Sequence, residues 1–168
     1  MFYKLEIKQK IEILYPNRDY LLMSNVLRKP PHLGIVSNNS YLDLSLKGVS
    51  VNTLPDSMLK VIKNKNIPTI ILEFNQFEHV NIKDIFTSHL LKYKKVDVNN
   101  TCFTPIKELL VTLNADVEKL IFFYEFLTDE KIFKFFFKEI YNYNLDNLLT
   151  NNCIELETYN KRDFLKFL

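Results

Sequence analysis

The first part of the chain carries two stretches whose apolar and polar residues are arranged as in β-strands. Residues 3–14 alternate apolar with polar side chains, which is the period of a strand with one buried face. Tyr20–Val26 is a short apolar run of the kind found in strands that are buried on both faces. The polar segment Pro16–Asp19 separates the two stretches and indicates a turn.

A β-hairpin is predicted next. The segment Arg28–Pro31 interrupts the chain with two prolines, and strands are then expected at His32–Ser37 and Tyr41–Leu46. Asn38-Asn39 joins these strands, and asparagine tolerates the left-handed backbone that a tight hairpin needs. A third short strand is expected after Gly48.

Helical and strand patterns alternate in the middle of the chain. A helix is predicted from Pro55 through Ile62, and Ile67–Phe74 has the β-branched content of a central strand. Residues 80–95 fit either a helix or a strand. A polar cluster leads to Cys102 and a further helix, whose apolar residues recur at helical spacing: Ile106, Leu109, Leu110 and Leu113.

The last third of the chain is rich in phenylalanine. Residues 115–145 are predicted to form two helices separated near Thr128-Asp129, followed by a strand at Ile154–Glu157 and a final short helix. No linker, repeat or low-complexity segment divides the 168 residues. The sequence therefore predicts a single domain, with a core over residues 1–114 and a Phe-rich helical extension over residues 115–168.

Composition and charge argue against several classes of function. With 47% hydrophobic residues and 22 Lys+Arg against 20 Asp+Glu, the chain has the make-up of a globular protein of formal charge +2. Its basic residues are dispersed, so no nucleic-acid partner is expected, because phosphate binding needs a dense positive surface. No apolar run reaches the ~20 residues of a transmembrane helix.

The same data suggest a location for the protein. The N-terminus lacks the apolar stretch of a secretory signal, and the two cysteines form no CxxC pair. Abundant Asn, Lys and Ile with only 2 glycines is typical of an AT-rich genome, such as that of a virus, a phage or a low-GC bacterium. We expect a cytoplasmic or virion-associated protein.

Cys102 is the candidate nucleophile. It lies where a helix begins, and the free N–H groups and the dipole at that end stabilise a thiolate, whereas Cys153 has no such support. His32 is preferred among the three histidines as the base, because it opens a strand directly after the proline break. Asp43, on the next strand, is expected to accept a hydrogen bond from the imidazole, with Glu73 as the alternative orienting carboxylate.

These segments resemble a known family. HLGIVSNNSYLDLS is similar to the His-strand of NlpC-type papain-like proteins, and NNTCFTPIKELLVTLN is similar to their Cys-helix. The His-strand comes first here, as in the circularly permuted branch that includes lecithin retinol acyltransferase-like enzymes. The chain departs from that pattern in having Thr101 before the cysteine, Asp43 at the orienting position and Pro105 in the first turn of the helix.

The resemblance implies an α+β fold in which a small antiparallel sheet packs against the Cys-bearing helix, with additional C-terminal helices. It also implies a thiol hydrolase or acyltransferase that acts on an amide or ester bond. Cys102 would be the nucleophile, His32 the general base and acid, and Asp43 the orienting group, with backbone N–H groups near Cys102 as oxyanion donors. The substrate would be a peptide, a peptidoglycan or a lipid ester, and no cofactor is expected.

A non-catalytic module on the same scaffold is the alternative, because a fold does not fix a function. Cys102 would then be a buried structural cysteine, His32 a capping or surface histidine, and Asp43 a solvated strand residue or a turn partner. Residues 117–141 would mediate self-association or contact with a virion partner through their aromatic side chains. His79 and His89 lack further ligands at suitable spacing, so no metal site is predicted.

Overall fold

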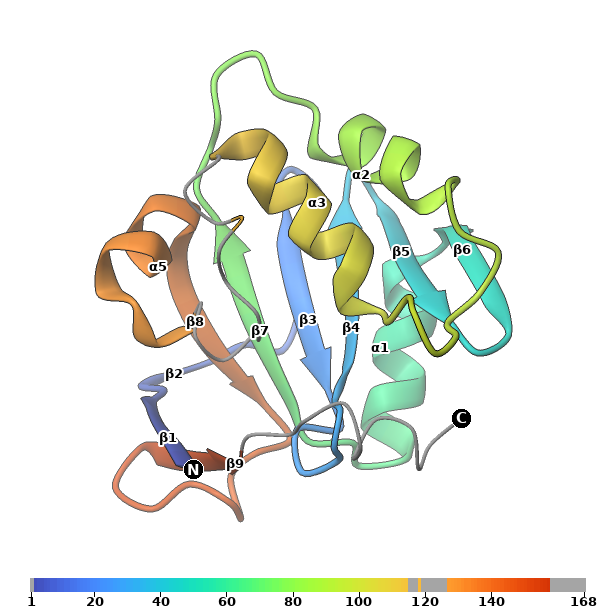
Figure 1. The fold of residues 1–168 in the computed structure, drawn as a ribbon. Helices are drawn as coiled ribbons and strands as arrows, with labels where there is room; N and C mark the ends of the chain where they lie inside the picture. The colour runs from blue at the N-terminus through green and yellow to red at the C-terminus, as the bar shows by residue number, and fades with distance from the viewer. Residues whose placement is uncertain (1, 115–117, 119–126, 158–168) are drawn as a thin grey trace.

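Two β-sheets form the framework of the protein. The computed structural model describes residues 2–114, 118 and 127–157. Its strands are β1 (Phe2–Glu6), β2 (Gln9–Lys10), β3 (Tyr20–Ser24), β4 (His32–Ser37), β5 (Ser40–Ser45), β6 (Gly48–Thr53), β7 (Thr69–Phe74), β8 (Phe137–Tyr143) and β9 (Cys153–Glu157). Seven of them form one sheet in the order β2-β8-β7-β3-β4-β5-β6, and β1 pairs with β9 in a second sheet (Figure 1). Neighbours in the large sheet are antiparallel except for β2 and β8.

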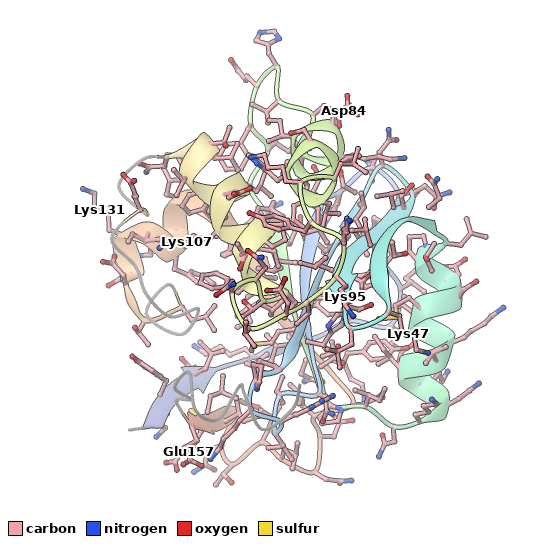
Figure 2. All side chains as sticks on the ribbon, turned by 45° about the vertical axis from the view of Figure 1, so that its right-hand side comes forward. Lys47, Asp84, Lys95, Lys107, Lys131 and Glu157 are labelled. Atoms are coloured by element: carbon pink, nitrogen blue, oxygen red, sulfur yellow. The ribbon has the colours of Figure 1, made fainter. Side chains whose placement is uncertain are left out.

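Helices cover both faces of the large sheet. They are α1 (Pro55–Asn64), α2 (Ile82–Leu90), α3 (Phe103–Leu113) and α5 (Glu130–Phe136). The apolar side chains of α1 pack on one face, and those of α2 and α3 pack on the other (Figure 1). Side chains fill the space between these layers (Figure 2). No helix in the described ranges combines the length and the apolar character that crossing a bilayer needs.

The central strands alternate their side chains between two cores. Tyr20 and Leu22 of β3 join the core beneath α1, while Leu21 and Met23 join the core beneath α2 and α3. Because both faces of the sheet are covered, strands such as β3 and β7 are buried throughout. The apolar run at Tyr20–Val26 therefore predicts its strand correctly.

Several other predicted elements are confirmed. The hairpin strands β4 and β5 lie where the pattern places them, and the turn residues Asn38 and Asn39 adopt left-handed φ angles of 45° and 54°. The strand after Gly48 is β6, and the helix after Pro55 is α1. The ambiguous residues 80–95 contain a helix, α2.

The α+β class is confirmed, but the predicted small antiparallel sheet is a sheet of seven strands. The single strand predicted over residues 3–14 is wrong: β1 and β2 are separate short strands that belong to different sheets. Alternation alone predicts that a segment is extended, but it does not reveal which strand is its partner.

The C-terminal third also differs from its prediction. Two helices are predicted over residues 115–145, yet among the described residues α5 passes directly into β8, which lies between β7 and β2. Tyr141 and Tyr143 of β8 pack in the core beneath α1, and aromatic residues at alternate positions favour a strand. With β9 paired to β1, residues 115–168 are not simply a helical extension.

The aromatic residues proposed to bind a partner are only partly described. Within residues 117–141, residues 117 and 119–126 lie outside the described residues. Phe136 and Phe137 are buried in the core beside α3, so these two side chains form no docking surface. The short helix predicted after Glu157 lies outside the described residues.

Gly34 allows an aromatic ring to lie across the hairpin. A Cβ atom at position 34 would be 2.4 Å from the hydroxyl oxygen of Tyr41 and 2.6 Å from two of its ring carbons. Gly34 pairs with Asp43, which is two residues after Tyr41 and points to the same face of β5. Glycine is therefore required where the Tyr41 ring covers the sheet next to Asp43.

The substitution Gly34→Ala is expected to lower the free energy of unfolding by about 1–3 kcal/mol, because the added methyl group overpacks against the Tyr41 ring. Urea unfolding measures this cost. In a Tyr41→Ala background the same substitution should cost much less, since the clashing ring is absent. Equal costs in the two backgrounds would contradict the packing argument.

Candidate active site

His32 and Asp43 are hydrogen-bonded across the β4–β5 hairpin. His32 is the first residue of β4, and Asp43 pairs with Gly34, so the two side chains are diagonal neighbours on one face of the sheet. Nε2 of His32 lies 2.6 Å from Oδ2 of Asp43, and the Asp43 side chain is only 11% exposed. The Asp43 carboxylate thus holds the imidazole in one orientation. Nδ1, the other ring nitrogen, remains available to another partner.

Cys102 lies at the N-terminus of α3, as the N-cap residue. Its neighbours supply the local capping: the Phe103 N–H donates to Thr101 Oγ1 at 3.1 Å, and the Thr101 N–H donates to Thr104 Oγ1 at 2.9 Å. Pro105 lies in the first turn, where a backbone N–H has no helical acceptor. The Cys102 N–H makes no hydrogen bond to any described residue.

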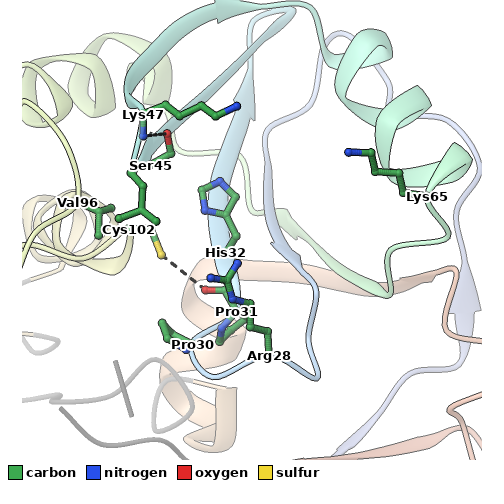
Figure 3. Close-up of a pocket in the computed structure, with 10 residues that line it drawn as sticks. Arg28, Pro30, Pro31, His32, Ser45, Lys47, Lys65, Val96 and Cys102 are labelled. Carbon is green, nitrogen blue, oxygen red and sulfur yellow. Dashed lines mark hydrogen bonds between the residues drawn. The ribbon is translucent and has the colours of Figure 1, made fainter. Parts of the chain in front are cut away.

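Cys102 and His32 meet at one cavity. The Cys102 thiol donates to the carbonyl oxygen of Pro31, the residue before His32, with Sγ 3.6 Å from that oxygen. Both side chains line a cavity of about 520 Å³ (Figure 3). The loop before α3 is held against the end of β5, because the Val96 N–H donates to the Ser45 carbonyl at 2.9 Å. Folding therefore brings together the sulfur and the imidazole that the sequence analysis selected.

The environment of His32 favours its charged form. Burial lowers the pKa of the imidazole, but the hydrogen bond with Asp43 and the effects of the nearby Cys102 sulfur and the Asp43 charge outweigh burial and raise this pKa to about 10. The ring is therefore protonated at neutral pH, between a carboxylate and a sulfur. A thiolate beside an imidazolium is the arrangement that activates a cysteine for nucleophilic attack.

Tyr41 is a component of the site that the sequence analysis did not select. Burial, and then the charges of Asp43 and Cys102, raise the pKa of its phenol well above the ordinary value, so the hydroxyl keeps its proton. That hydroxyl is buried and makes no hydrogen bond to any described residue. The sequence signal for it was Gly34, because an isolated glycine inside a strand indicates a close approach of another group.

Glu73, the alternative orienting carboxylate, lies away from His32. It belongs to β7, which is separated from β4 by β3. Arg18 donates to its two carboxylate oxygens at 3.1 and 3.0 Å, and the Tyr141 hydroxyl donates to it at 2.7 Å. These partners account for the burial of Glu73, and Asp43 is the carboxylate that orients the imidazole.

The remaining cysteine and histidines lie elsewhere. Cys153 begins β9 in the small sheet, and His79 lies in a loop with a left-handed φ of 60°. His89 of α2 contacts Thr112 and Glu108 of the neighbouring helix α3. Within the described ranges, no three His, Cys, Asp or Glu side chains gather as a set of metal ligands.

Comparisons with known proteins assign no family to the chain. No family model, no curated protein and no solved structure matches it. The papain-like resemblance of the His32 and Cys102 segments therefore stays a prediction. Any function has to be argued from the geometry of the site itself.

We predict that His32 keeps its proton at a pH at which His89 has lost its own. In an NMR titration of the imidazole carbons, the pKa of His32 should be about 10, whereas burial and Lys92 hold the pKa of His89 below its ordinary value. Asp43→Asn and Cys102→Ser should each lower the pKa of His32, because each removes a group that raises it. An unchanged value in Cys102→Ser would show that the sulfur does not interact with the imidazole.

Stability should depend on pH through the same group. The pKa of His32 rises from 6.5 in the unfolded chain to about 10 on folding, so its contribution to stability is complete below about pH 6.5 and is lost as the pH rises toward 10. The difference in free energy of unfolding between the wild type and Asp43→Asn should therefore narrow over this range. Urea unfolding at each pH measures this difference in free energy. A difference that widens as the pH rises would contradict the conclusion that His32 is protonated in the folded protein.

Proposed function

We propose that the protein is a thiol-dependent hydrolase or acyltransferase that acts on an amide or ester bond. The observation that carries the proposal is the arrangement of three groups. Cys102 and His32 line one cavity, and His32 is hydrogen-bonded to the buried carboxylate of Asp43 at 2.6 Å. A nucleophile, a base beside it and a group that orients the base are the parts that covalent acyl transfer requires.

Formation of the thiolate is the first step. Before substrate binds, the Cys102 proton has passed to Nδ1 of His32, because Nε2 is occupied by Asp43, and this transfer forms the imidazolium described above. The positive end of the α3 dipole and the imidazolium both stabilise the resulting thiolate. Asp43 stabilises the imidazolium and holds its ring in one orientation, so the ion pair is prepared before substrate binds.

Acylation of the sulfur follows. The thiolate attacks the substrate carbonyl carbon, a C–S bond forms, and the carbonyl electron pair moves to the oxygen. The Cys102 N–H, which has no hydrogen-bond partner in the described part of the chain, is a donor for this oxyanion. The C–N or C–O bond then breaks as the His32 imidazolium gives its proton to the leaving group, which leaves an acyl thioester on Cys102.

Deacylation returns the site to its starting state. Water, or another acceptor with an O–H or N–H, gives a proton to His32 and attacks the thioester carbonyl. The C–S bond breaks and the thiolate leaves as the acyl group passes to the acceptor. A hydrolase uses water in this step, and an acyltransferase uses the other acceptor. A peptide, a peptidoglycan or a lipid ester contains the bond that this chemistry cleaves.

Cys102 should react with iodoacetamide at neutral pH at least about tenfold faster than Cys153, because only Cys102 has an imidazolium and a helix N-terminus beside it. Mass spectrometry of the two cysteine peptides measures both rates in one sample. His32→Gln should slow the labelling of Cys102 to the rate of Cys153, and Asp43→Asn should slow it less. His89→Gln is the matched control and should change neither rate.

The same variants test turnover. With a chromogenic p-nitrophenyl ester, the wild type should form an acyl thioester on Cys102 and release p-nitrophenol, and Cys102→Ser and His32→Gln should abolish this reaction. Equally slow alkylation of the two cysteines, with no acyl group on Cys102, would overturn the enzyme proposal and favour the non-catalytic module.

A further inference from the structure

Cationic side chains from three separate segments line the cavity of Cys102 and His32. Arg28 follows β3, Lys47 lies in the turn between β5 and β6, and Lys65 lies just beyond the end of α1. Figure 3 shows the Lys47 side chain above His32, Lys65 to its right and Arg28 below it. Positive charge is thus concentrated at one place in a chain whose formal charge is only +2.

The charges of Lys47 and Lys65 are not neutralised by carboxylates at the cavity. No aspartate or glutamate is among the described residues that line it. No carboxylate in the described part of the chain forms a salt bridge with Lys47 or Lys65, whereas Lys10, for example, pairs with Asp146. In the proposed resting site, the Asp43 carboxylate and the Cys102 thiolate carry two negative charges and the His32 imidazolium carries one positive charge, so the two charges of Lys47 and Lys65 exceed the net negative charge that remains. An incoming anion therefore meets a positive potential at the mouth of the cavity.

We propose that the substrate of this site carries an anionic oxygen group, a carboxylate or a phosphate, close to the carbonyl that Cys102 attacks. The proposal rests on the proposed thiol chemistry for the reacting carbonyl. The ammonium groups of Lys47 and Lys65 are point charges on flexible stems, which accept either kind of anion. The apolar lining, which includes Leu46 and Val96, contacts the uncharged part of the substrate.

The size of the expected effect follows from Coulomb's law. Lys47 and Lys65 are exposed, so their attraction for a nearby anion is reduced by water. Each lysine then contributes about a twofold preference for an anionic over a neutral ligand at the sulfur, and the two together contribute about fourfold. Added salt reduces this preference, because it screens exposed charges.

Iodoacetate and iodoacetamide test the proposal directly. They alkylate a thiolate by the same displacement of iodide, and only iodoacetate carries a carboxylate. The ratio of their rate constants should be several-fold higher at Cys102 than at Cys153. The His32 imidazolium also attracts iodoacetate, so lysine variants that keep His32 decide the question.

The lysine variants distinguish the effect of the charges at the cavity from the effect of other charges on the protein surface. Lys47→Met and Lys65→Met should each lower the ratio at Cys102 about twofold, and the double variant should lower it about fourfold. Lys63→Met, two residues earlier on α1, is the matched control and should leave the ratio unchanged. A ratio that is unaffected in the double variant would overturn the proposal.

Competition experiments identify the anion. Acetate and inorganic phosphate, at constant ionic strength, are added during iodoacetamide labelling of the full chain. The anion that slows labelling of Cys102 at the lower concentration represents the preferred group, and the double lysine variant should lose this protection. Protection that persists unchanged in the double variant would contradict the assigned lysines.

The two proposals fail in different ways. If iodoacetamide labels Cys102 no faster than Cys153, the thiol chemistry fails, while the ratio of the two reagents still reports the charge at the cavity. If iodoacetamide labels Cys102 rapidly but iodoacetate shows no dependence on Lys47 and Lys65, the thiol enzyme is retained and the anionic substrate is rejected.

Discussion

The hydrogen bond between His32 and Asp43 is the interaction on which the site depends. Asp43 lies on a strand that is covered on both faces, and a buried carboxylate without a partner would be costly. The His32 imidazole is that partner, with Nε2 2.6 Å from Oδ2 of Asp43, and the carboxylate in turn stabilises the charged form of the imidazole. The charge state of the site is therefore a consequence of packing the hairpin, and it exists before any substrate binds.

The position of the site at the end of the sheet follows from the two layers. Leu33 belongs to the core beneath α2 and α3, so alternation places the neighbouring His32 on the face covered by α1. Cys102 lies at the start of α3, on the opposite face, and its sulfur contacts the carbonyl oxygen of Pro31, directly before β4 begins. The cavity is consequently lined by residues from both layers, including Lys65 beyond α1 and Val96 before α3.

Sequence reasoning succeeded where the signals were local. Two strands joined by Asn38-Asn39 predict a hairpin, and this hairpin places His32 beside Asp43 through residues only eleven positions apart. It failed for β8, whose partners β7 and β2 are distant in the chain and whose aromatic residues also fit a helix. The cavity lysines were not predicted either, because they come from separate turns and no sequence pattern relates them.

The same face of the sheet carries a second buried carboxylate, Glu73, and its contrast with Asp43 explains why the proposed chemistry is assigned to His32. The partner of Glu73 is Arg18, whose guanidinium does not release a proton in the range in which proteins function. The Arg18–Glu73 pair therefore neutralises the buried charge but cannot take part in proton transfer. Asp43 instead has His32 as its partner, and the Cys102 sulfur lines the same cavity as that histidine. Both buried carboxylates have a cationic partner, but only the pair at His32 holds a proton that can be transferred, and for this reason the proposed acyl-transfer chemistry is assigned to that end of the sheet.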